Sequence, residues 1–149
     1  MAKNYAQGKF TPTNPNKYVG KKLPTYRSGW ELTFCQFCDN HPSVISWASE
    51  SISIPYKNPL TGRNTFYVPD FFIVYEDKNG NRKAELIEVK PVSQTTMENA
   101  RSTHDKAAVA VNMAKWAAAT AWAKQQGIVF RVVTEQDIYR GAAPKKRRR

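Results

Sequence analysis

Residues 69–90 read PDFFIVYEDKNGNRKAELIEVK, and they predict the centre of the fold. Two apolar runs, the first starting at Tyr67 and the second at Ala84, flank a polar insert. The insert contains Asn79-Gly80, a pair typical of a tight turn between two strands. The stretch therefore predicts two antiparallel strands joined by a turn.

Three ionisable side chains lie on these strands where an apolar surface is expected. Side chains alternate between the two faces of a strand, which places Asp70 on one face of the first strand and Glu88 and Lys90 on one face of the second. If these faces coincide, two carboxylates and an amine meet at one end of an apolar surface. Ionisable groups there are costly unless they are paired or bound to a metal. Carboxylate oxygens suit Mg²⁺, so the pattern predicts metal-assisted phosphodiester hydrolysis.

The composition points to a polyanionic partner. The 149 residues include 23 Lys and Arg against 12 Asp and Glu, a net charge of +11. This favours nucleic acid first and an acidic membrane surface second. No apolar run approaches the roughly 20 residues that span a bilayer, and residues 1–22 lack the apolar core of a secretory signal. With Cys35 and Cys38 alone, no disulfide framework is expected, which fits a reducing intracellular setting.

Basic segments are expected on both sides of a single domain that spans residues 25–140. Residues 1–24 form an extended basic arm with aromatic residues among its lysines, which lies on the body or on nucleic acid, or else is a disordered tail. Residues 141–149 form a flexible basic tail that attracts phosphates in a salt-sensitive way. The cations of this tail are Lys145, Lys146, Arg147, Arg148 and Arg149.

A helix is predicted to start at Ser28 and to run to about Asp39. Ser28 followed by Glu31 forms a capping box, so Glu31 has two interpretations, a cap for its own helix and a functional acid. Cys35-x-x-Cys38 on this helix suggests zinc. However, structural zinc takes four ligands, and a helical Cys is more often a small buried hydrophobe.

A strand is predicted from Val44 to Tyr56, with the Tyr67 strand as its antiparallel neighbour. Glu50 falls on an otherwise apolar face of this strand. A salt bridge with a lysine or an arginine is the favoured interpretation, and an approach to the active site is the alternative.

A long Ala-rich helical stretch is predicted from about Met97 to Gln126, as one helix or as two with a break near Ser102. Gly127 is placed to cap it, and Ile128–Val133 is predicted to be a short buried strand. The core face of the helical stretch is expected to include Val109, Met113, Trp116, Ala119 and Ala123. The lysines expected to face outward, toward phosphates, are Lys106, Lys115 and Lys124.

This order of elements and residues resembles the PD-(D/E)xK nuclease superfamily. The likeness is carried by Glu31, by Pro69-Asp70 and by Glu88-Val89-Lys90. Within the superfamily, Arg27-Ser28-x-x-Glu31 with a later Pro-Asp-Phe is similar to TnsA-type endonucleases and to phage Holliday-junction resolvases. Further motifs resemble the head-completion nucleases of large tailed phages: Tyr26-Arg27-Ser28-x-Trp30-Glu31, Trp47-Ala48-Ser49-Glu50, Ile54-Pro55-Tyr56 and Tyr67-x-Pro69-Asp70-Phe71.

The resemblance implies an α/β fold with a restriction-endonuclease-like core, in which helices flank a central mixed sheet of three antiparallel strands plus one. It implies that Asp70 and Glu88 hold a divalent metal together with the Val89 carbonyl. Lys90 is expected to orient or activate the attacking water. Glu31 is expected to bind a second metal or one of its waters.

The expected function is a DNA endonuclease that uses Mg²⁺, with Mn²⁺ as a substitute, in phage head completion or DNA processing. Arg27, Lys106 and Lys115 are expected to contact DNA, with Ser28 and Glu50 supporting the site. Alternatives are a DNA-binding or virion structural protein without chemistry, and a Holliday-junction resolvase. The resemblance also implies the capsid portal as a partner, in the virion or the host cytoplasm. A homodimer suits double-strand cutting, and a monomer suits nicking.

Overall fold

The structure, a computed structural model, describes residues 7–98 and 100–137. The predicted basic tail, residues 141–149, lies outside the described residues. The elements in chain order are β1 (Gly8–Lys9), η2 (Pro15–Lys17), β2 (Thr25–Tyr26), α1 (Gly29–Asn40), β3 (Val44–Ser49), β4 (Ile54–Lys57), β5 (Asn64–Tyr67), β6 (Phe71–Glu76), β7 (Arg82–Val89), η3 (Val92–Gln94), α2 (Thr103–Gln125) and β8 (Val129–Val133).

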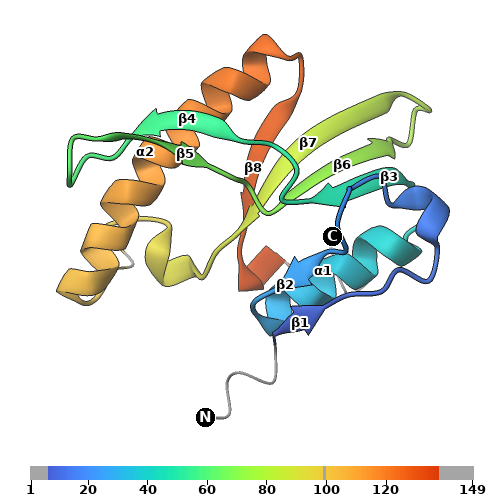
Figure 1. Cartoon of the computed structure of the whole chain (residues 1–149), viewed down its shortest axis with the longest axis horizontal. Coiled ribbons are helices and arrows are strands. Elements are labelled where there is room, and N and C mark those ends of the chain that lie inside the picture. The colour runs from blue at the N-terminus through green and yellow to red at the C-terminus, as the bar shows by residue number, and fades with distance from the viewer. Residues whose placement is uncertain (1–6, 99, 138–149) are drawn as a thin grey trace.

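Four strands form the central sheet in the order β3-β6-β7-β8. β3, β6 and β7 are antiparallel neighbours, and β8 runs parallel to β7. A parallel pair needs a long crossover connection, which α2 supplies (Figure 1). The predicted fold, a mixed sheet of three antiparallel strands plus one with flanking helices, is confirmed.

The central hairpin has the predicted register. Phe72 pairs with Leu86 and Val74 pairs with Ala84, so the strand faces expected to carry the acidic residues do coincide. In the turn, Gly80 has a φ of +84°, which costs glycine little because it has no Cβ.

Two predicted strands are shorter than expected, because each is interrupted. Glu50 has a φ of +50°, a left-handed conformation that ends the extended run from Val44. Pro69 has no N–H to donate to a ladder, and β5 and β6 are separate strands on either side of residues 68–70. As a result, β4 and β5 pair only with each other, in a hairpin that lies across α2 (Figure 1). The alternation predicted through Glu50 was therefore wrong.

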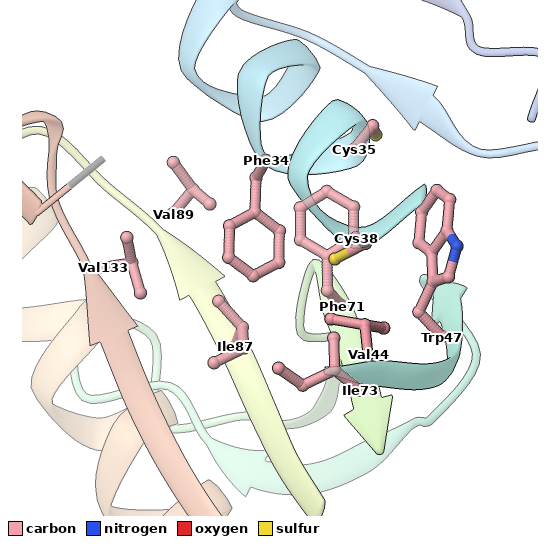
Figure 2. Close-up of a cluster of buried hydrophobic side chains, with 10 residues drawn as sticks. All are labelled: Phe34, Cys35, Cys38, Val44, Trp47, Phe71, Ile73, Ile87, Val89 and Val133. Atoms are coloured by element: carbon pink, nitrogen blue, oxygen red, sulfur yellow. The ribbon is translucent and has the colours of Figure 1, made fainter. Parts of the chain in front are cut away.

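One hydrophobic cluster joins α1 to the sheet (Figure 2). Phe34 of α1 points between strands β6 and β7, and its ring centroid lies 4.8 Å from that of Phe71. Cys35 and Cys38 are fully buried in this cluster as free thiols. They are therefore core residues, as the favoured interpretation held. The cluster consists of Phe34, Cys35, Cys38, Val44, Trp47, Phe71, Ile73, Ile87, Val89 and Val133.

A second cluster fills the opposite face of the sheet, between α2 and the β4–β5 hairpin. Its buried members are Ile54, Tyr67, Leu86 and Ala119. Leu86 and Ile87 are neighbours on β7 and belong to different clusters, as expected for a strand that is covered on both faces.

The described part of the N-terminal arm, residues 7–24, packs on the body. The ring centroids of Phe10 and Tyr18 lie 6.0 and 4.8 Å from the ring centroid of Trp47. Asp39, which is 1% exposed, accepts hydrogen bonds from the backbone N–H groups of Thr13 and Asn14 at 2.8 and 3.0 Å. Of the interpretations left open, contact with the body therefore holds for these residues.

Predictions for the C-terminal half were partly wrong. α2 starts only at Thr103, because the Ser102 hydroxyl caps it by accepting a hydrogen bond from the Asp105 N–H. Met113, assigned to the core face, is 55% exposed. Strand β8 lies at the edge of the sheet, where Val129 is 56% exposed, so it is not the buried strand that was expected. Within the described ranges, no helix is both long and apolar enough to cross a membrane.

Candidate active site

Three elements bring the predicted acidic residues together. Asp70 lies just before β6, Glu88 lies near the end of β7 and Glu31 lies in the first turn of α1. Phe71 pairs with Ile87, so the next residues outward along this register are Asp70 and Glu88. The buried ring of Pro69 ends the β5 ladder at this point, which turns the chain into β6 with Asp70 at its start.

Glu88 is a buried carboxylate with defined partners. It is 6% exposed, and the Tyr67 hydroxyl donates a hydrogen bond to its Oε1 at 2.7 Å. The Lys90 Nζ lies 3.7 Å from its Oε2. Burial raises the pKa of Glu88 above the usual range, against the opposing effects of the Tyr67 hydrogen bond and of Lys90. The carboxylate therefore gains from any cation placed beside it.

Asp70 is held against the end of β7. The Val89 N–H donates to its Oδ2 at 2.7 Å. Burial raises the pKa of Asp70, and repulsion from Glu88 and then Glu31 raises it further. Because these carboxylates are close enough to disfavour one another's charge, their arrangement favours binding of a positive ion.

Glu31 has a structural role at the start of α1, and its role as a functional acid stays a prediction. The Ser28 hydroxyl caps α1 by accepting a hydrogen bond from the Glu31 N–H at 3.1 Å. The Glu31 carboxylate accepts from the Arg27 N–H at 3.2 Å and from the Ser28 hydroxyl at 3.4 Å. The same carboxylate contributes to the raised pKa of Asp70, so it holds the segment that leads into its helix and also lies near the acidic pair.

Glu50 forms the salt bridge that the sequence favoured, and its partner is Arg27. This pair lies beside the site, because the Glu50 N–H donates to the Asp70 carbonyl at 2.9 Å. The Arg27 side chain stays 55% exposed, which leaves it open to an anion even though it is paired.

The structure adds Tyr67 and changes the place of one predicted lysine. Lys115 of α2 is half-buried, with its Nζ 5.5 Å from the centroid of the Tyr67 ring. Burial lowers the pKa of Lys115, and so does the neighbouring charge of Lys90. Lys115 therefore faces the site instead of pointing outward as expected, whereas Lys106 is exposed as predicted.

Tyr67 stands in the motif Tyr67-x-Pro69-Asp70-Phe71 that carries the resemblance, but no role in the site was predicted for it. Unbroken alternation from Asp70 places it on the opposite face of the strand. The interruption at residues 68–70 changes that phase, and the Tyr67 hydroxyl consequently reaches Glu88.

The donor set fits a hard divalent cation. In the part of the chain that the structure describes, no three His, Cys, Asp or Glu side chains gather closely enough to hold a metal. Mg²⁺ does not require such a cage, because it binds through one or two carboxylates, substrate phosphates and water. Asp70 and Glu88 satisfy that requirement. The Val89 carbonyl stays a predicted further ligand.

A mixed sheet with a buried Glu88, a partly buried Asp70 and a lysine at the open end of its central hairpin defines the class of restriction-endonuclease-like nucleases. In agreement, residues 41–135 match the family model described as "TnsA-like endonuclease N terminal", and the chain belongs to this family. It is similar to the head completion nuclease of Enterobacteria phage T4, with 36% identity over 141 residues that cover 88% of this chain and 92% of that protein. The range matched by the family model, residues 41–135, contains Asp70, Glu88 and Lys90 but begins after Glu31.

Proposed function

We propose that this protein is a Mg²⁺-dependent DNA endonuclease whose catalytic groups are Asp70, Glu88, Lys90 and Glu31. One observation carries the proposal: Asp70 and Glu88 share a partly enclosed site, each has a raised pKa, and the Lys90 amine lies 3.7 Å from the Glu88 carboxylate. A protein that only binds DNA gains nothing from such acids, because they repel phosphates.

Asp70 and Glu88, with the Val89 carbonyl, are the groups that hold the metal, and Mn²⁺ substitutes for Mg²⁺. The bound ion offsets phosphate charge and lowers the pKa of a water molecule. The Val89 N–H fixes the orientation of Asp70, and the Tyr67 hydroxyl fixes that of Glu88.

Lys90 supplies a positive charge beside the attacked phosphate. Its amine orients the attacking water and stabilises the negative charge that develops on the phosphate oxygens. Glu31 completes the acidic rim of the site as a ligand of a second metal or of one of its waters.

The similar phage protein, which is named a head completion nuclease, supports a proposal about the biological setting. We propose that this chain processes DNA ends or branches during the same stage of assembly, in the host cytoplasm or the virion. The capsid portal is then a candidate partner. This proposal is separate from the catalytic one and does not affect its test.

The test is cleavage of supercoiled plasmid in Mg²⁺, in Mn²⁺ and in EDTA. The wild-type protein is expected to convert the plasmid in either metal and to leave it intact in EDTA. Lys90→Ala is expected to be inactive, whereas Lys78→Ala, which removes an exposed lysine from the β6–β7 turn, is expected to cut at the wild-type rate. Cleavage by Lys90→Ala at the wild-type rate would contradict the site assignment. Open circles indicate nicking, and linear product indicates paired cuts.

A further inference from the structure

A groove of about 410 Å³ lies between the N-terminal segment and the end of β3. One wall is formed by the loop that follows Tyr18, together with Lys9 of β1. The other wall is Ser49-Glu50-Ser51, where the chain leaves the sheet. The lining is basic on one side and carries hydroxyl groups on the other.

The lysines of this groove have uncompensated charge. Among the described residues, Lys9, Lys21 and Lys22 form no ion pair with an acid, and all three are exposed. Glu50, the acidic residue of the lining, already pairs with Arg27. Three cations therefore converge on a groove whose acidic group is occupied, and this excess favours an anionic ligand.

The loop that presents Lys21 and Lys22 is held in place by specific contacts. The Tyr18 hydroxyl donates to the Lys22 carbonyl at 2.5 Å and accepts from the Ser49 N–H at 3.3 Å. The loop passes so close to this hydroxyl that a Cβ on Gly20 would lie 2.3 Å from it. The Tyr18 ring also packs edge-on against the buried Trp47. The backbone that carries Lys21 and Lys22 is thus held in place relative to β3.

The groove is joined to the candidate active site through Glu50. The Glu50 N–H donates to the Asp70 carbonyl, so the wall of the groove is bonded directly to the segment that carries the catalytic Asp70. Thr25 of the lining is two residues from Arg27, whose exposed guanidinium pairs with Glu50 of the lining and also interacts electrostatically with Glu31 and Asp70. A chain of phosphates that leaves the acidic pair on this side therefore has Arg27 and the three lysines as nearby cations.

We propose that this groove holds the backbone of the DNA strand beyond the cleaved phosphate, with Lys9, Lys21 and Lys22 neutralising successive phosphates. Lysine ammonium groups are suited to this task as point charges, and the Ser49 and Ser51 hydroxyls are suited to phosphate oxygens. The inference rests on the proposed function and deepens it, because it gives the substrate a direction across the protein.

Binding in EDTA tests the groove without chemistry. Anisotropy of a labelled 30-base-pair duplex, measured from 50 to 400 mM KCl, compares the Lys9→Ala/Lys21→Ala/Lys22→Ala variant with the wild-type protein. The control variant is Arg63→Ala/Lys78→Ala/Arg82→Ala, which removes three exposed cations from elsewhere. The groove variant is expected to raise Kd about tenfold or more at 100 mM KCl and to lower the salt slope by about 2 to 3, since each phosphate contact contributes about 0.9. Equal effects of the two variants would overturn the proposal.

A second variant separates position from charge. Tyr18→Phe keeps every lysine and the ring packing but removes the hydroxyl that holds the Lys22 carbonyl. It is expected to weaken duplex binding several-fold at an unchanged melting temperature. Wild-type binding by this variant would show that the loop does not have to be held, and would overturn the idea of a built groove.

The outcomes also distinguish this inference from the proposed function. If the wild-type protein fails to cut DNA but the groove variant still loses binding selectively, the nuclease proposal fails and the groove holds. If the wild-type protein cuts and the groove and control variants bind alike, the nuclease proposal holds and the groove fails.

Discussion

Two carboxylates at the centre of the site keep their charge only at a cost. Asp70 and Glu88 are both shielded from water and close to each other. Asp77, in the β6–β7 turn, is the opposite case, because hydrogen bonds from the Asn81 and Asn79 N–H groups lower its pKa. One short hairpin therefore contains a carboxylate that destabilises the metal-free fold and another that stabilises it.

The first prediction concerns Asp70→Asn in EDTA. The folded-state pKa of Asp70 is above its unfolded value, so its contribution to stability is fully present below the unfolded pKa, about 4, and is lost as pH rises through the folded pKa. The amide of Asp70→Asn cannot ionise, so the variant does not lose stability as pH rises through this range. Its amide oxygen can still accept a hydrogen bond from the Val89 N–H. We expect its free energy of unfolding at pH 7.5 to exceed that of the wild-type protein, with the difference shrinking toward pH 4.5.

Urea unfolding at several pH values measures this difference. Asp77→Asn is the control, and it is expected to have the opposite sign, with destabilisation at pH 7.5 that disappears in acid. A wild-type protein more stable than Asp70→Asn at neutral pH without metal would show that the site carries no such repulsion.

The second prediction concerns the Tyr67 hydroxyl, which orients Glu88. Tyr67→Phe should bind Mg²⁺ about tenfold more weakly, because groups that orient a metal ligand typically contribute 10- to 100-fold in affinity. Binding is measured by the melting temperature, which Mg²⁺ is expected to raise in the wild-type protein and to leave unchanged in Asp70→Asn. Tyr75→Phe is a matched control, because the Tyr75 hydroxyl also donates to a glutamate of β7. Its distance to Glu85 is 2.7 Å, the same as the distance from the Tyr67 hydroxyl to Glu88. Equal Mg²⁺ affinity for both tyrosine variants would contradict the role of Tyr67.

At the scale of elements, the N-terminal segment depends on the end of α1. Asp39 receives two backbone hydrogen bonds from this segment, and its own carbonyl accepts from Asn14 Nδ2 and Lys17 Nζ at 2.8 and 3.1 Å. The segment has little regular structure of its own, so these contacts and the packing on Trp47 determine where it lies.

The third prediction is that Asp39→Ala loosens this segment. The loss of a buried acceptor is expected to lower the free energy of unfolding by roughly 1–3 kcal/mol. Trypsin is then expected to cleave after Lys9 and Lys17 before it attacks the sheet. Asp39→Asn keeps one acceptor oxygen, so its stability and its trypsin sensitivity should lie between those of the wild-type protein and Asp39→Ala. Unchanged trypsin sensitivity in Asp39→Ala would show that the packing on Trp47 suffices.

At the scale of the whole molecule, charge has to bring a polyanion to an acidic centre. The acids of the site repel phosphate, and the net charge of +11 overcomes this repulsion at long range. On the proposed function, cations near the site such as Arg27 and Lys115 are then expected to act on the phosphates at short range.

The fourth prediction is that deletion of residues 145–149 acts through charge alone. The deletion removes five cations and lowers the net charge from +11 to +6. Duplex binding is expected to weaken and its salt slope to fall, because fewer phosphates are neutralised, while the melting temperature stays constant. A salt slope equal to that of the full-length protein would show that these cations do not contact DNA.

Local patterns in the sequence determined the centre of this protein. The turn at Asn79-Gly80, the alternation along β6 and β7 and the cap at Ser28 all follow from interactions within a few residues, so they were predictable. The convergence of Asp70, Glu88 and Lys90 followed from the same alternation. Resemblance added the expected roles of these groups, which await the experiments above.

Only the tertiary structure decided what surrounds that centre. The left-handed turn at Glu50 and the break at Pro69 moved β4 and β5 out of the sheet, which reset the alternation and brought Tyr67 to Glu88. The inward place of Lys115 and the groove of N-terminal lysines depend on packing between segments far apart in the chain. Alternation carries information only along an unbroken strand. Beyond a break, the direction of a side chain is set by long-range contacts that no local pattern records.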